Sequence, residues 1–372
     1  MIPYVLCYCF CIYFSYRAEK VLEYNKKICF TVYSLLAVLL PTLLAGCRDY
    51  SVGVDINIYV RPTFVYALKY SSLVSFLEFN AAWYKSVDVL FAILVYVVSR
   101  FTNNCHWVLL VISALINGFF YAGFVKMRQY TKIWFGMAMF LLYYYIPSLN
   151  IMRQMLAAAI IFYSFSYLLK KEYIKYIFGV TIAALFHSSG LFGLVYLLIH
   201  KYMKGRYKSV KSLFLMAAAT AISLFLPYFV SVLVHVGVFP VKYLNYVSGH
   251  LQGSKLNIVL ITLNFIRLML VALNAKILLK NNNNNDLLLQ CGILDFMLYF
   301  FKVYSEYASR LNLYTGPAFC LLAGQLPSVA TKDYNKKLYT IFFLGIGFIY
   351  WIYSFVVQGY HSAIPFVFSI NP

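Results

Sequence analysis

Long apolar runs recur along the whole chain, and short segments rich in lysine and arginine separate them. A helix needs roughly 20 apolar residues to cross a bilayer, where every backbone N–H and C=O must be bonded within the spanning structure. Of the 372 residues, 63% are hydrophobic and only 11% are charged, which is more apolar surface than a soluble core buries. The pattern therefore predicts an all-α protein, a polytopic membrane helical bundle without a sizeable soluble domain.

Thirteen apolar runs are candidate spans, but alternating all thirteen would place basic clusters on both sides of the membrane, against the positive-inside rule. Run 86–99 has about 14 residues, the length of an interfacial or re-entrant segment. Without it, about twelve transmembrane helices remain, in a single integral membrane domain over 1–372 with external regions at 47–104 and 231–256. The runs are 2–16, 28–46, 86–99, 105–125, 132–147, 150–169, 173–187, 189–200, 212–230, 257–279, 287–304, 310–327 and 338–358.

The formal charge of +20 follows the same topology. With both termini outside, the predicted internal loops hold twenty of the 31 basic residues, as expected for loops kept in the cytoplasm. A nucleic-acid-binding protein would instead carry a basic face on a folded surface, so we expect no nucleic-acid partner. One of these loops contains the low-complexity run Asn281–Asn285, which we expect to be solvated.

Eleven basic residues lie outside those loops, and ionisable groups near membrane depth are functional candidates because they are costly there. Arg48 and Asp55 follow the second span, with Tyr59 after them and Gly53 between them. Gly53 permits a sharp turn that would return Arg48 and Asp55 to one pocket at the outer surface. An ion pair confined to this loop is the alternative interpretation.

A second cluster opens the span that begins near residue 150. Asn150, Arg153 and Gln154 stand at i, i+3 and i+4, so we expect them to share one helical face, at a helix N-terminus that favours anions. The alternative is an interfacial arginine whose charged end reaches the lipid headgroups.

Two further clusters lie at the same predicted outer surface. His187 stands in a polar break between apolar runs, where an imidazole can exchange a proton near neutral pH; a structural hydrogen-bonding histidine is the alternative. Glu306 and Arg310 lie at the external start of run 310–327. All four clusters thus fall on one side of a membrane topology chosen from the lysines alone, which favours a shared site.

These residues resemble those of the EpsG family of exopolysaccharide proteins, which is related to the Wzy O-antigen and capsule polymerases. The resemblance covers nearly the whole chain, with departures at Val54, where Thr is common, and Ser188, where Pro is common. The motifs that carry it are Arg48-Asp49 with Val52-Gly53-x-Asp55 and Tyr59, Asn150 with Arg153-Gln154, Phe186-His187-x-Ser189, and Arg310 with Tyr314.

The resemblance implies a GT-C-like, multi-span, metal-independent glycosyltransferase in the bacterial cytoplasmic (inner) membrane, with no cofactor. It would polymerise polyprenyl-diphosphate-linked oligosaccharide repeat units into exopolysaccharide, capsule or O-antigen on the outer face, among membrane lipids and with a chain-length regulator as a further partner. Arginine forks suit a diphosphate, and either His187 or Asp55 would take the acceptor proton. The diphosphate-binding residues would be Arg48, Arg153 and Arg310, supported by Gln154, Asn150, Tyr59, Glu306 and Tyr314.

Two other functions stay open from the sequence. A transporter (flippase) for lipid-linked oligosaccharides would place cations within spans that line a cavity, and Arg267 is the feature in its favour. An O-antigen ligase, or an acyltransferase of the same pathway, would share the arginine and histidine chemistry. Arg267 and Asp295 lie at similar depth in consecutive antiparallel spans, so we expect them to pair, with Asn264 on the same inward face as Arg267.

Overall fold

The computed structural model describes residues 1–83, 87–202, 228, 231–237, 257–300, 309–330 and 332–369. The chain forms two compact units: unit 1 comprises 1–193 and 344–372, and unit 2 comprises 194–343. Across the described residues the secondary structure is helical, apart from one isolated β-bridge between Arg48 and Phe368. The all-α prediction is confirmed.

The helices follow the apolar runs. Each of the other twelve runs contains a helix among the described residues, whereas run 212–230 lies outside them apart from residue 228. Unit 1 contains α1 (Ile2–Glu23), α2 (Lys27–Gly46), η1 (Ile56–Val60), α3 (Arg61–Lys69), α4 (Leu73–Trp83), α5 (Val89–Ser99), α6 (His106–Lys126), α7 (Ile133–Tyr143), α8 (Tyr145–Asn150), α9 (Met152–Leu169), α10 (Tyr173–Phe186), η2 (Ser188–Phe192), η5 (Ile352–Val357) and η6 (Tyr360–Ser362). Unit 2 contains most of α11 (Gly193–Tyr202), then α13 (Ile258–Leu273), α14 (Ala275–Asn281), α15 (Asn285–Leu298), α17 (Asn312–Ala323) and α18 (Leu326–Val329); α19 (Asp333–Trp351) crosses the unit boundary.

Four described segments are long and apolar enough to cross a bilayer: α2, α6, α9 and the stretch Asp333–Val357. A fifth results if α13 and α14, bent by 60° at their junction, form one span. Helix α5 has 11 residues and so extends about 16 Å, short of a ~30 Å core. These segments define a helical membrane protein, whereas the count of twelve spans and the external placement of 47–104 and 231–256 stay predictions.

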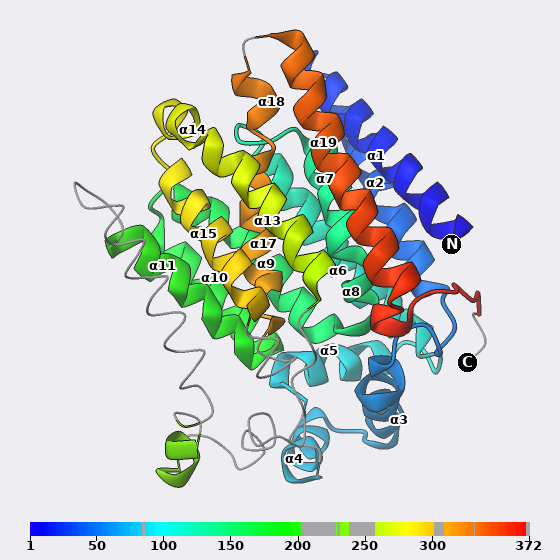
Figure 1. Cartoon of the computed structure of the whole chain (residues 1–372). Coiled ribbons are helices and arrows are strands. Elements are labelled where there is room, and N and C mark those ends of the chain that lie inside the picture. The colour runs from blue at the N-terminus through cyan, green and yellow to red at the C-terminus, as the bar shows by residue number, and fades with distance from the viewer. Residues whose placement is uncertain are drawn as a thin grey trace. The chain divides into compact units, whose positions relative to one another are not determined.

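Helices α1 and α2 lie side by side (Figure 1), and a proline explains one of the contacts between them. Pro41 lies inside α2 and has no N–H, so the carbonyl of Ala37, four residues earlier, loses its helical donor. The thiol of Cys11 on α1 donates to that carbonyl, with 3.1 Å between Sγ and O. A backbone group that would otherwise be costly in an apolar interior is thereby satisfied.

Helices α9 and α10 form an antiparallel hairpin through a three-residue turn. Gly179 on α10 allows the close approach, because a Cβ there would lie 2.0 Å from Oγ of Ser164 on α9. The hairpin geometry brings the first turn of α9 and the last turn of α10 to the same end of the pair. Arg153 and His187, at those two ends, are positioned by this packing.

An aromatic cluster joins the first helix of unit 1 to its last segment. The ring centroid of Tyr8 lies 5.6 Å from that of Tyr145 and 5.9 Å from that of Trp351. Trp351 Nε1 donates to the Tyr8 hydroxyl at 3.3 Å, and the Tyr4 hydroxyl donates to the Ala363 carbonyl at 2.7 Å. Residues near the two ends of the chain therefore share one core.

In unit 2, Arg267 on α13 and Asp295 on α15 form the expected pair. Arg267 Nη2 lies 2.9 Å from Asp295 Oδ2, and the side chains are 2% and 5% exposed. Thr315 on α17 donates to the other carboxylate oxygen at 2.8 Å, and the guanidinium carbon lies 4.9 Å from the centre of the Phe319 ring. Asn264 is buried as well. The predicted pair and the inward direction of this face are confirmed.

Arg267→Leu should lower the amount of folded protein, because it leaves the Asp295 carboxylate buried without its cation, at a cost of about 3 to 5 kcal/mol. The swap Arg267→Asp with Asp295→Arg should recover part of the loss. Folded yield in detergent is the measurement, with Lys276→Leu, which removes an exposed charge in the same helical pair, as the control. A well-folded but inactive Arg267→Leu protein would instead favour a functional role for Arg267, as a transporter requires.

The expectation of a solvated loop at 281–285 is wrong for Asn285. Asn285 is fully buried and exchanges two hydrogen bonds with Gln325: its Nδ2 donates to Gln325 Oε1 at 2.8 Å, and Gln325 Nε2 donates to its Oδ1 at 2.9 Å. Two primary amides can satisfy each other in this way, which removes most of the penalty for burying them. The low-complexity run therefore ends in a structural contact.

Candidate functional site

The first two sequence clusters meet at the break between α8 and α9. Gly53 has φ +97°, and a Cβ there would lie 2.5 Å from the carbonyl oxygen of Leu149, so both the predicted turn and the close approach require glycine. Two residues later, the Asp55 N–H donates to Asn150 Oδ1 at 3.0 Å. The segment 53–55 is thus docked on the last turn of α8.

The Arg48 side chain points into the protein next to the α8–α9 break and is fully buried. Its Nε donates to the Val52 carbonyl at 3.2 Å, one Nη donates to the Leu149 carbonyl at 3.0 Å, and the other donates to the Ala45 carbonyl. Burial lowers the pKa of Arg48 to about 10, so the guanidinium stays charged at neutral pH. In this arrangement Arg48 ties the end of α2 to the α8–α9 break.

Arg153, in the first turn of α9, pairs with Asp88, the residue that precedes α5. Arg153 Nη1 lies 3.0 Å from Asp88 Oδ2, with the two side chains 15% and 22% exposed. The guanidinium carbon stands 4.2 Å from the centre of the Tyr59 ring and 5.9 Å from that of Phe91. An arginine held by a carboxylate and an aromatic face keeps a defined direction at the edge of the helix bundle.

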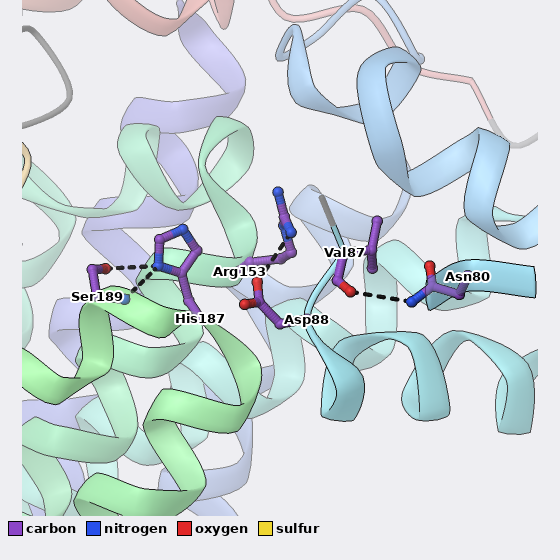
Figure 2. A network of polar contacts seen from close by, with 6 residues as sticks. All are labelled: Asn80, Val87, Asp88, Arg153, His187 and Ser189. Atoms are coloured by element: carbon purple, nitrogen blue, oxygen red, sulfur yellow. Dashed lines mark hydrogen bonds and ion pairs between the residues drawn. The ribbon is translucent and has the colours of Figure 1, made fainter. Parts of the chain in front are cut away.

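His187 ends α10 and caps the short helix η2, which packs against α9. The Ser189 N–H donates to His187 Nδ1 at 3.2 Å, and Ser189 Oγ lies 2.6 Å from the same nitrogen. A backbone N–H can only donate, so Nδ1 is an acceptor and the neutral ring carries its proton on Nε2. In Figure 2 the Arg153–Asp88 ion pair lies between this turn and the contact of Asn80 with Val87.

Residues from the C-terminal segment reach the same junction. Asn150 Nδ2 lies 3.2 Å from His361 Nδ1, and the Gly53 N–H donates to the Ser362 carbonyl at 3.2 Å. Further along, the Asp49 N–H donates to the Val367 carbonyl at 2.8 Å. A histidine some 200 residues away in sequence is therefore part of the site's surroundings.

The remaining candidates are distributed as follows. Gln154 is buried in α9. Asn150 does not share a helical face with Arg153, because Ile151 (φ −85°, ψ 56°) breaks the helix between them, so that expectation is wrong. Arg310 and the buried Tyr314 belong to unit 2, and their place in the predicted pocket stays a prediction. Glu306 lies outside the described residues.

Asp88 and His361 were missed by reasoning from the sequence. Asp88 carries a usable signal, since it is one of only 11 acidic residues in the chain and directly precedes an apolar run. Asn80 supports it from α4 by donating to the Val87 carbonyl at 3.1 Å. His361 has no such signal, because its partner Asn150 becomes apparent only once the chain is folded.

Among the described residues no group of three or more His, Cys, Asp or Glu side chains could hold a metal ion. The long apolar helices are those of an integral membrane protein, and the residues described above form a polar cluster of arginine, carboxylate and histidine in unit 1. The chain belongs to the EpsG family, whose match spans residues 31–368. This membership assigns it to polysaccharide biosynthesis. No curated protein and no solved structure matches the chain.

Proposed function

We propose that the protein polymerises polyprenyl-diphosphate-linked oligosaccharide repeat units on the outer face of the bacterial cytoplasmic membrane. Family membership supports the pathway. The observation that carries the reaction is the partly exposed Arg153–Asp88 pair, set at the start of α9 on the end of the hairpin that also bears His187. A guanidinium in that place suits the diphosphate of a lipid carrier.

In the proposed step, a hydroxyl oxygen of the acceptor sugar bonds to the anomeric carbon of the donor glycan. The bond from that carbon to the diphosphate oxygen breaks, and the diphosphate leaves with the electron pair. Arg153 stabilises the negative charge that develops on the leaving group. The acceptor proton goes to a general base, and no metal is required to balance the step.

The imidazole geometry separates the roles of His187 and Asp55. Because Ser189 fixes His187 Nδ1 as an acceptor, neutral His187 presents an Nε2–H that donates to a diphosphate or sugar oxygen. Asp55, half-buried at the start of η1 and held through its backbone by Asn150, is then the base for the acceptor hydroxyl. Arg310 and Tyr314, which belong to unit 2, stay predicted diphosphate-binding and supporting residues.

The test gives purified protein synthetic lipid-diphosphate repeat units, without added metal, and follows the products by gel. Wild-type protein should yield a ladder of longer glycans. His187→Ala should stop chain growth, with a rate about 100-fold or more below that of wild type, because it removes a preorganised donor. His235→Ala, which removes an exposed histidine, should leave the ladder intact. Absence of a ladder from wild-type protein would overturn the polymerase; transfer of lipid-linked glycan to a different acceptor would favour a ligase, and movement across vesicles without transfer a flippase.

A further inference from the structure

The C-terminal turn, residues 359–363, is bonded at two points to the elements that hold Asp55. His361 meets the Asn150 side chain, and the Ser362 carbonyl accepts from the Gly53 N–H. Helix η6 within this turn packs against α8 and η5. Asn150 thus lies between Asp55 and His361, and its side-chain oxygen and nitrogen bond to different partners.

The donor and the acceptor can be assigned in both hydrogen bonds of the Asn150 side chain. The Asp55 backbone N–H can only donate, so the atom of Asn150 that faces it is the carbonyl Oδ1. The amide nitrogen Nδ2 must then face His361, and since Nδ2 only donates, His361 Nδ1 must accept. His361 therefore holds the Asn150 amide at its nitrogen, while the Asp55 N–H holds it at its oxygen.

We propose that His361 is a positioning residue for Asp55, acting through Asn150. The inference rests on the proposed function, in which Asp55 is the base. Asn150 is only 7% exposed, where bulk water cannot replace a lost partner at little cost. Without the His361 acceptor, the Asn150 amide is held on one side only, so segment 53–55 is less firmly placed and the carboxylate spends less time in its working place.

The backbone at His361 allows a clean comparison of variants. Its φ is +69°, a left-handed value that glycine and asparagine adopt most readily. His361→Gly removes the acceptor without adding backbone strain. His361→Asn keeps the same backbone and places Oδ1 on Cγ, as Nδ1 is placed in histidine, so it can accept from Asn150 Nδ2.

In the lipid-diphosphate assay, His361→Gly should lower kcat about fivefold to tenfold, the effect of one hydrogen bond, with KM for the lipid-linked donor unchanged within about twofold. His361→Asn should restore kcat to within about twofold to threefold of wild type. Thermal unfolding of each purified variant in detergent accompanies the kinetics. His361→Ser, whose hydroxyl is too short to reach Asn150, replaces the Gly variant if that protein does not fold.

Each outcome is decisive. A lower kcat in the Gly or Ser variant with rescue by Asn supports the proposal. Equal kcat for wild type and Gly, a change confined to KM, or no rescue by Asn would overturn it. Loss of folded protein in both the Gly and Ser variants would make the contact structural and overturn it too. Failure of the polymerase itself is distinguished by a wild-type protein that makes no ladder.

Discussion

Arg153→Ala is expected to reduce chain growth by about 100-fold to 1,000-fold in kcat, the usual effect of removing one preorganised donor to a developing anion. The alanine variant also leaves the Asp88 carboxylate beside the site without its partner, which adds repulsion toward a diphosphate. Arg153→Lys should be impaired as well, although the charge is kept, because a lysine cannot reproduce the bidentate fork or its stacking on Tyr59.

The measurement is the rate of glycan extension by purified protein at saturating lipid-linked substrate. Arg61→Ala is the matched control, since Arg61 is an exposed arginine of the same unit whose guanidinium carbon lies 5.0 Å from the centre of the Tyr50 ring. Its rate should stay within about twofold of wild type. Ladders of normal length from Arg153→Ala protein would show that this pocket is not the catalytic one.

Arg48→Met should act on stability, with an expected fall of about 2 to 4 kcal/mol in the free energy of unfolding. Methionine fills much of the space but donates nothing, so the carbonyls of Val52, Leu149 and Ala45 lose a buried donor. Relief from burying a charge offsets part of this loss, which is why the expected change is smaller than the sum of the lost bonds.

Unfolding in detergent, followed by intrinsic fluorescence, measures this change, with Arg61→Met as the control for an exposed arginine. The experiment also separates two roles for Arg48. If it binds the diphosphate, as the sequence suggests, the methionine variant should unfold like wild type and fail only in the assay. If it ties α2 to the α8–α9 break, stability should fall first.

Much of the fold could be predicted because apolar runs are local properties of the sequence. The Arg267–Asp295 pair was also predictable, since two charges in consecutive predicted spans have few partners other than each other at the expected membrane depth. The meeting of the first two clusters was expected because both were assigned to one side of the membrane, and in the structure the turn at Gly53 brings Asp55 against Asn150. These inferences depend on short-range pattern and on the high cost of unpaired charge.

The remaining features depend on contacts that no local pattern encodes. Asp88 becomes the partner of Arg153 only after α5 packs against α10 and α9 against η2. In the sequence, Asn285 looks like part of a solvated asparagine run. Its burial is tolerated because Gln325, 40 residues away, forms two hydrogen bonds with its side-chain amide. His361 is similar, because an imidazole near the end of the chain gains its role from the amide it happens to face.

The aromatic cluster of Tyr8, Tyr145 and Trp351 can be completed only late in synthesis. Unit 2 is inserted between the two parts of unit 1, so a ribosome completes residues 194–343 before it releases Trp351 and Ala363. Until then the Tyr8 hydroxyl lacks the Trp351 donor and the Tyr4 hydroxyl lacks the Ala363 acceptor. Unit 2 can therefore finish folding first, while unit 1 still lacks the contacts that Trp351 and Ala363 make with its first helix.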